Sequence, residues 1–230
     1  MDRRTIVATA AIALLALVSA CQTQPTLTDE TSPDGLVKVK NSFFQLAWVR
    51  PGIDLSSYDK IMLEGVGIEY RPARAATSAM QAQVRGQTEF ALSEDQKARL
   101  KEVVRKAFES ELAKSKSFTL VDQPGPSTLR IRGALTDVVS FVPPNPVGAG
   151  RVYLRDVGEA TLMFEVRDSQ SEQIFARAAD RRAVEKNLPQ QSNSVTNGFE
   201  VEQVARQWAI VLRQRLDAIK ELHATAKATG

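Results

Sequence analysis

The stretch that decides the fold is ATLMFEVRDSQSEQIFARAADRRAV, Ala160–Val184. Its first eight residues alternate between apolar side chains and mostly polar ones, the period of two that a half-buried strand requires. The next five residues, Asp168–Glu172, are rich in side chains that form tight turns. The segment Gln173–Val184 then returns as a second strand. Together they predict a β-hairpin at the centre of the domain.

Further strands are expected on the N-terminal side of this hairpin. Leu129–Val139 alternates, with Leu129 and Ile131 on one face and charged residues on the other. Phe118–Val121 is a short strand, and Tyr58–Ile68 reads as a buried strand in which two glycines suggest a bulge. The mostly antiparallel or mixed sheet should therefore contain about five strands.

Two amphipathic helices flank these strands. Ser93 and Gln96 fit a capping box, and apolar residues from Leu100 to Leu112 recur at helical spacing. A second helix is expected from Phe199 to Leu222, after a polar loop over Asn187–Gly198. The order β-α-β-β-β-β-α predicts an α+β two-layer sandwich with both helices on the sheet. Pro72–Glu89 is expected to be a loop or lid.

Composition excludes several classes of protein. The 230 residues carry a formal charge of only +3, too small an excess for a typical nucleic-acid binder. One cysteine and one histidine leave no disulfide framework, no Cys/His zinc site and no Ser-His or Cys-His catalytic pair. No Gly-rich phosphate loop is visible, so neither a nucleotide nor any other cofactor or metal is expected.

The N-terminus has the features of an export signal. Arg3 and Arg4 precede an apolar run from Ile6 to Ala20, which is too short to cross a bilayer. Val18–Cys21 resembles a bacterial lipobox, which implies cleavage after residue 20 and lipidation of Cys21. Gln22 in the next position, where Asp commonly marks inner-membrane retention, implies sorting to the outer membrane with the domain facing the periplasm.

The remaining chain is divided by composition. Residues 1–20 are the signal peptide, 21–36 a lipidated flexible tether with few apolar side chains, and 37–222 a single periplasmic domain. Residues 223–230 are expected to be a frayed tail. His223 lies at this end of the last helix, so a solvated terminal histidine is expected there.

Several strings resemble a known bacterial family. WVRPGIDLSSYDK (Trp48–Lys60), LTDVV (Leu135–Val139), Asp168-Ser169 and the late Trp208-Ala209, together with the lipobox, are similar to the lipoproteins of domain of unknown function 3313. The resemblance covers nearly the whole mature chain and implies one envelope domain without an established activity. The turn after Asp168 departs from the family's Gly-containing form, because it carries Glu172.

The most distinctive candidate site is Trp48, Arg50 and Tyr58. These side chains could form an exposed recognition patch, since aromatic residues and arginine dominate binding hot spots. The alternative is structural: Trp48 closes one end of the core and Pro51-Gly52 makes a tight turn. Trp208 is expected in the core.

Two groups of charged residues could be functional, and each also has a structural explanation. An acid pair could hydrolyse glycans, and the acids on or beside predicted strands are Glu64, Glu69, Glu159 and Glu165. Acids alternating on strands are more typical of a solvated sheet face. A basic stretch could contact phosphate or lipid head groups, or simply protect a sheet edge; its members are Arg177, Arg181, Arg182 and Lys186.

The sequence thus favours an outer-membrane lipoprotein with a non-catalytic periplasmic domain, an accessory module that binds an envelope protein or peptidoglycan. The alternative is a carboxylate-dependent hydrolase of cell-wall glycan. A third option is a lipid-handling role, which would require an apolar cavity.

Overall fold

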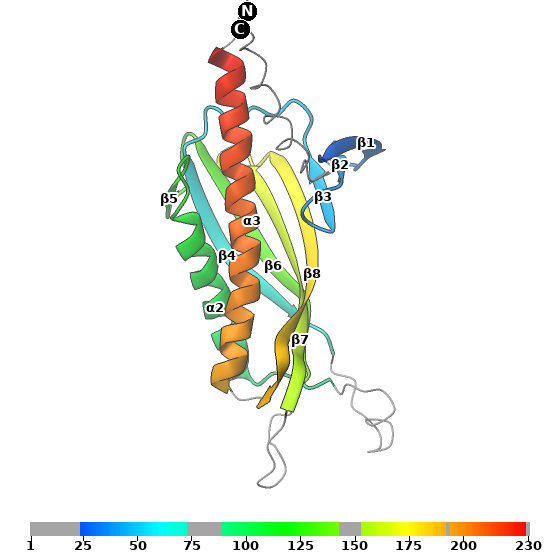
Figure 1. Ribbon diagram of the computed structural model, residues 1–230. Coiled ribbons are helices and arrows are strands. Elements are labelled where there is room, and N and C mark those ends of the chain that lie inside the picture. The colour runs from blue at the N-terminus through cyan, green and yellow to red at the C-terminus, as the bar shows by residue number, and fades with distance from the viewer. Residues whose placement is uncertain (1–23, 73–88, 143–152, 192–193, 229–230) are drawn as a thin grey trace, which may run out of the picture.

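One mixed sheet of eight strands forms the body of the protein (Figure 1). The computed structural model describes residues 24–72, 89–142, 153–191 and 194–228. The strands are β1 (Thr26–Thr31), β2 (Val37–Lys40), β3 (Leu46–Val49), β4 (Lys60–Tyr70), β5 (Thr119–Val121), β6 (Thr128–Ser140), β7 (Tyr153–Asp168) and β8 (Ile174–Gln191). Their order in the sheet is β1-β2-β3-β8-β7-β6-β4-β5. The expectation of about five strands was too low.

The pairing is antiparallel except around β4, which runs parallel to both β5 and β6. The central hairpin is β7 and β8, in register from Met163 opposite Ala179 through Val166 opposite Ala176. The predicted bulge in β4 is present, because the register with β6 shifts between Glu64 and Gly67. The mixed sheet is therefore confirmed.

Two helices, α2 (Glu94–Leu112) and α3 (Ser194–Ala228), cover one face of this sheet (Figure 1). The capping box is confirmed: the Ser93 hydroxyl accepts from the backbone N–H of Gln96, and the Gln96 side chain accepts from the N–H of Ser93 at 2.8 Å. The α+β class and the two layers are as predicted.

The core lies between the helices and the sheet. The fully or almost fully buried aromatic side chains are Phe44, Phe108, Phe118, Phe164, Phe175 and Trp208. Phe44 and Phe164 meet edge to face with ring centroids 5.0 Å apart. Trp208 is only 2% exposed, which confirms its place in the core.

Polar contacts fix the helices in place. The indole N–H of Trp208 donates to the buried carboxylate of Asp180 on β8 at 2.8 Å. Beyond the end of α2, the hydroxyl of Ser115 donates to Asp217 of α3 at 2.5 Å, and Lys220 donates to the carbonyl of Ser117 at 2.8 Å. These contacts hold α3 against both α2 and the sheet.

The tether expected over residues 21–36 is interrupted by structure. Thr26–Thr31 forms β1, which pairs with β2, and β2 in turn pairs with β3. Five of the six β1 residues are exposed. Backbone hydrogen bonds rather than apolar burial hold this strand, so its sequence carries no hydrophobic period.

The C-terminal boundaries also differ from expectation. The polar loop predicted over Asn187–Gly198 was wrong, because β8 continues to Gln191 and α3 already begins at Ser194. The tail predicted over residues 223–230 is helical as far as Ala228. Alanine and lysine favour helix even without an apolar stripe, so the helix continues beyond the apolar pattern from which it was predicted. The predicted loop over Pro72–Glu89 lies almost entirely outside the described residues.

The β7–β8 turn is built around Asp168. Its carboxylate accepts hydrogen bonds from the backbone of Gln170 at 3.1 Å and of Ser171 at 2.6 Å. Glu172 follows with a φ of 58°, in the left-handed region that favours glycine. An ion pair with Arg130 holds the Glu172 side chain in place. A residue other than glycine thus occupies the left-handed position of this turn.

Candidate functional site

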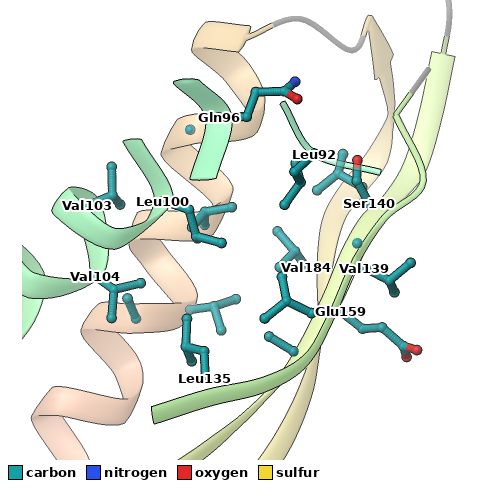
Figure 2. Close-up of a pocket in the computed structure, with 18 of the residues that line it drawn as sticks. Leu92, Gln96, Leu100, Val103, Val104, Leu135, Val139, Ser140, Glu159 and Val184 are labelled. Carbon is teal, nitrogen blue, oxygen red and sulfur yellow. The ribbon is translucent and has the colours of Figure 1, made fainter. Parts of the chain in front are cut away.

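An apolar cavity of about 190 Å³ lies between α2, α3 and the sheet (Figure 2). Leu100, Val103 and Val104 of α2 form one wall, and Leu135 and Val139 of β6 lie across from them. The cavity also contacts residues near the beginnings of α2 and α3. It therefore lies at the end of the domain opposite the last turns of α3 (Figure 1).

Small side chains leave this space open. Of the buried aromatic residues of the core, only Trp208 reaches the cavity, and the rest of the apolar lining is aliphatic. Gly158 of β7 lies in the wall, where a Cβ atom would stand 2.5 Å from the carbonyl oxygen of Val139. Alanine and glycine on β7 and α3 supply further room. The cavity therefore exists because several separate elements contribute small side chains to its wall.

The polar groups near the cavity lie at its rim or turn away from it. Figure 2 shows the Glu159 carboxylate directed away from the aliphatic side chains, and Arg71 and Arg181 bind it at 2.7 and 2.5 Å. The Ser140 hydroxyl accepts from the N–H of Val142 at 3.1 Å. Arg99 lines the rim and forms no ion pair with any described residue. The lining is mainly aliphatic, and its one acid, Glu159, is bound by two arginines.

The helix-free face of the sheet is covered by ion pairs. Because side chains alternate along a strand, most charged residues of β6, β7 and β8 lie opposite the core, whereas Asp180 and Arg182 of β8 face the helices. A continuous chain of paired charges runs across this face: Asp34, Arg177, Glu165, Arg167, Glu172 and Arg130. We refer to these six residues as the ion-pair chain.

A second cluster is centred on Arg71, just after β4. Its guanidinium contacts Asp137 at 2.5 Å, Glu89 at 3.0 Å and Glu159 at 2.7 Å. The hydrogen bond from Arg71 holds the pKa of Asp137 below its usual range. No sequence pattern reveals this cluster, because its members come from four separate segments and show no common spacing.

Of the four acids proposed as possible catalytic groups, Glu64 and Glu165 are bound by arginines. The hydrogen bond from Arg132 lowers the pKa of Glu64. Burial favours a higher pKa for Glu165, but Arg167 and Arg177 outweigh burial and hold that pKa below its usual range. A general acid in glycoside hydrolysis needs the opposite shift. Glu69 is exposed on β4, and Glu159 belongs to the Arg71 cluster.

The structure separates the roles of Trp48, Arg50 and Tyr58. Arg50 donates to the carbonyls of Ile174 at 2.7 Å and Asp34 at 3.0 Å, so it ties the chain before β2 to the start of β8. Tyr58 donates to Asp168 at 2.9 Å. Both side chains have internal partners, as a structural role requires.

Trp48 lies half-buried on the helix-free face, with Lys38 5.8 Å from its ring centroid and Arg177 opposite in the next strand. It is the one member of the three that presents a partly accessible aromatic surface beside cations. The proposed patch is thereby reduced to Trp48 and its charged neighbours, and its role in recognition stays a prediction.

The basic stretch on β8 is divided between the two faces of the sheet. Arg177 and Arg181 pair with acids on the helix-free face, whereas Arg182 donates to Asp180 at 2.8 Å on the helix side. The described arginines therefore form no common basic surface. The side chains of Lys186 and His223 lie outside the described residues, as do Cys21 and Gln22.

The described residues show neither a metal-ligand cluster nor a membrane-spanning helix. No group of three or more histidine, cysteine or acidic side chains there is arranged to hold a metal ion. Neither described helix combines the length and hydrophobicity needed to cross a membrane.

Comparison with known proteins found one matching family and several similar structures. A family model described as a protein of unknown function (DUF3313) matches residues 31–212. No curated protein matches the chain. A neuraminyllactose-binding hemagglutinin homolog from Helicobacter pylori is similar in structure, with a TM-score of 0.41 and 11% identity over 77% of this chain and 93% of the other.

Two other solved structures are also similar. A Xanthomonas campestris protein of the DUF330 family has a TM-score of 0.40 and 10% identity, covering 77% of this chain and 93% of its own. The rare lipoprotein B from Shewanella oneidensis has a TM-score of 0.24 and 17% identity, covering 72% and 98%.

Proposed function

The chain belongs to the DUF3313 family, whose function is unknown, and on that premise we propose that it is an outer-membrane lipoprotein with a non-catalytic accessory domain in the periplasm. The domain binds its ligand or partner and does not convert it. Its partner is another envelope protein or peptidoglycan, and its anchor is the lipid on Cys21.

The anchor is supported by the sequence around Cys21. A basic start, a short apolar run and small residues before the only cysteine are the pattern of a lipoprotein signal. Several acyl chains on one residue give durable attachment, whereas a single chain gives marginal attachment. Gln22 supports the outer membrane as the destination.

One observation carries the non-catalytic assignment. The cavity between the helices and the sheet is lined by aliphatic side chains, while the acids of the neighbouring strands are paired with arginines on the other face. Chemistry on a glycan needs two facing carboxyl groups, one of them with a raised pKa. The described acids with shifted pKa values are shifted downward.

The test is an assay on isolated peptidoglycan sacculi. We expect the purified mature chain to release no soluble muropeptides, while a known glycan hydrolase in a parallel reaction does so. Release that is abolished by Glu165→Gln or Glu64→Gln would overturn the proposal in favour of a carboxylate-dependent hydrolase.

The accessory role is tested by crosslinking in the cell. We expect the lipidated protein to form one abundant adduct with an envelope protein or with peptidoglycan, identified by mass spectrometry. The same adduct should be depleted when Cys21→Ala removes the anchor. A protein that forms no adduct with either class of partner would contradict the accessory role.

A further inference from the structure

We propose that the cavity between α2, α3 and the sheet is a binding site for one acyl chain that carries an anionic head group. The hydrocarbon lies among the aliphatic side chains, and the head group lies at the rim beside Arg99. This inference rests on the proposed function and deepens it by naming the class of ligand.

The size and apolar lining of the cavity favour a hydrocarbon. An engineered apolar cavity of about 150 Å³ remains free of water and binds benzene. The cavity here, about 190 Å³, is larger and is lined mainly by valine, leucine and alanine. A ligand part of comparable volume can be buried without leaving a void.

The chemistry of the lining argues against other ligands. A sugar or nucleotide would bring hydroxyl and amide groups into a space with almost no partners for them, and each unpaired group costs free energy. A flat aromatic ligand would gain from stacking, but the only aromatic lining residue is Trp208, which is 2% exposed and held by Asp180. A saturated chain fits this surface without needing either kind of contact.

Charge at the rim selects the head group. Arg99 is exposed near the start of α2 and makes no ion pair with any described residue. The one acid in the lining, Glu159, directs its carboxylate to the far side and is bound by Arg71 and Arg181 (Figure 2). A carboxylate or phosphate at the rim would therefore meet a cation that has no ion-pair partner among the described residues.

The probe is hexadecanoate brominated near its methyl end, because bromine quenches indole fluorescence at short range. The protein is the mature chain, residues 21–230, with Cys21→Ala so that it has no acyl chain of its own. Trp48→Phe then leaves Trp208 as the only tryptophan. We expect saturable quenching of Trp208, since that side chain lines the cavity.

A matched pair of variants tests the position of the chain. Val201→Phe fills the cavity from α3 and should abolish the quenching. Val211→Phe makes the same change further along α3, outside the cavity, and should leave the quenching unchanged. Thermal unfolding checks both variants; if Val201→Phe fails to fold, Val103→Phe fills the cavity from α2 instead.

A second pair tests the head group. Arg99→Gln should weaken hexadecanoate binding by about fivefold, the effect of one solvent-exposed ion pair. Binding of hexadecanol, which has no charge, should be unaffected. Lys101→Gln removes a cation from α2 away from the rim and should change neither affinity.

The form in which the acyl chain is supplied distinguishes a free fatty acid from a membrane lipid. Quenching by soluble brominated hexadecanoate identifies a free fatty acid as the ligand. Quenching only by vesicles of phosphatidylglycerol with brominated acyl chains identifies a chain of a membrane lipid.

The proposal is wrong if Trp208 is not quenched in either form, or if Val201→Phe and Val211→Phe are quenched equally. That result would leave the proposed function intact, because the crosslinking and sacculus assays do not use this probe. Conversely, muropeptide release would overturn the proposed function without affecting the quenching.

Discussion

At the scale of single residues, Asp180 is the polar group on which the helix layer most depends. Its carboxylate, 5% exposed, accepts from the indole of Trp208, from Arg182 and from the backbone of Gln45. A buried acceptor with several donors cannot be removed without leaving those donors unpaired.

Asp180→Ala should therefore lower the free energy of unfolding by about 3 kcal/mol. Asp180→Asn keeps an acceptor for the indole and should lose less. The exposed Asp122→Ala, as a control, should change nothing measurable in urea unfolding. Equal stability of Asp180→Ala and the control would show that the indole contact does not hold α3.

Tyr58 contributes to stability in a way that is lost at alkaline pH. Burial, together with the hydrogen bond to Asp168, raises the pKa of Tyr58 from 10.0 to about 12. The folded state favours the neutral phenol, so this contribution is complete below pH 10 and is lost as the pH rises to 12.

Tyr58→Phe should cost about 1 kcal/mol at neutral pH, the value of one hydrogen bond. The difference from the wild type should shrink between pH 10 and pH 12, as followed by denaturant unfolding at fixed ionic strength. A difference that stays constant across that interval would mean that Tyr58 does not titrate with folding.

At this scale, sequence reasoning succeeded where side chains act through burial. Trp208 was expected in the core and lies there. It could not find Asp180 or Arg71, because their partners lie on segments far away in the chain and no local spacing records such contacts. The sequence comparison with the family showed that Glu172 lies where the family has a Gly-containing turn. The positive φ of Glu172 explains why a glycine suits this turn.

At the scale of elements, the contact between β6 and β7 depends on a glycine. Gly158 pairs with Ser140, and a Cβ there would stand 2.5 Å from the carbonyl oxygen of Val139. That oxygen belongs to the backbone, so the strands themselves would have to move apart.

Gly158→Ala should destabilise the protein by about 1–3 kcal/mol, the cost of overpacking a tight contact. Gly65→Ala is the matched control: it also lies in a strand, but nothing stands within 4 Å of its added Cβ. Its stability should stay within about 0.5 kcal/mol of the wild type. Thermal unfolding of the two variants measures the difference, and equal melting would show that the β6–β7 contact is not tight.

The elements that sequence reasoning found are those with a periodic apolar face. The central hairpin, β6 and α2 all bury such a face. For each of them, at least one end was predicted to within a few residues of its observed position. β1, β2 and β3 are short and are held by their neighbours. Their three-strand extension depends on pairing with β8, which no local pattern records.

At the scale of the whole molecule, the proposed outer-membrane location depends on one thiol. Cys21→Ala should leave the domain folded, because the proposed role of Cys21 is attachment to the membrane, yet the protein should no longer sediment with the outer membrane. Fractionation of cells by density gradient measures this, with an unmodified outer-membrane protein as marker. Continued flotation with the outer membrane would overturn the lipobox interpretation.

The cavity also belongs to this scale, and the sequence could name it only as a requirement of a lipid-handling role. It arises where small residues from β7 and α3 meet aliphatic ones from α2 and β6. Each element taken alone shows an ordinary apolar face. Only their assembly leaves space between them.

The pairing of β3 with β8 has a consequence for the order of events after export. Leu46 lies opposite Ala179, so the first strands of the chain complete a sheet edge that only the late hairpin provides. On the proposed export route through the inner membrane, β1, β2 and β3 emerge long before their partner β8. Contacts so distant in sequence slow folding, and the early segments stay exposed to aggregation meanwhile. We therefore expect folding to finish only after nearly the whole chain has been translocated, which would make this protein a client of periplasmic chaperones.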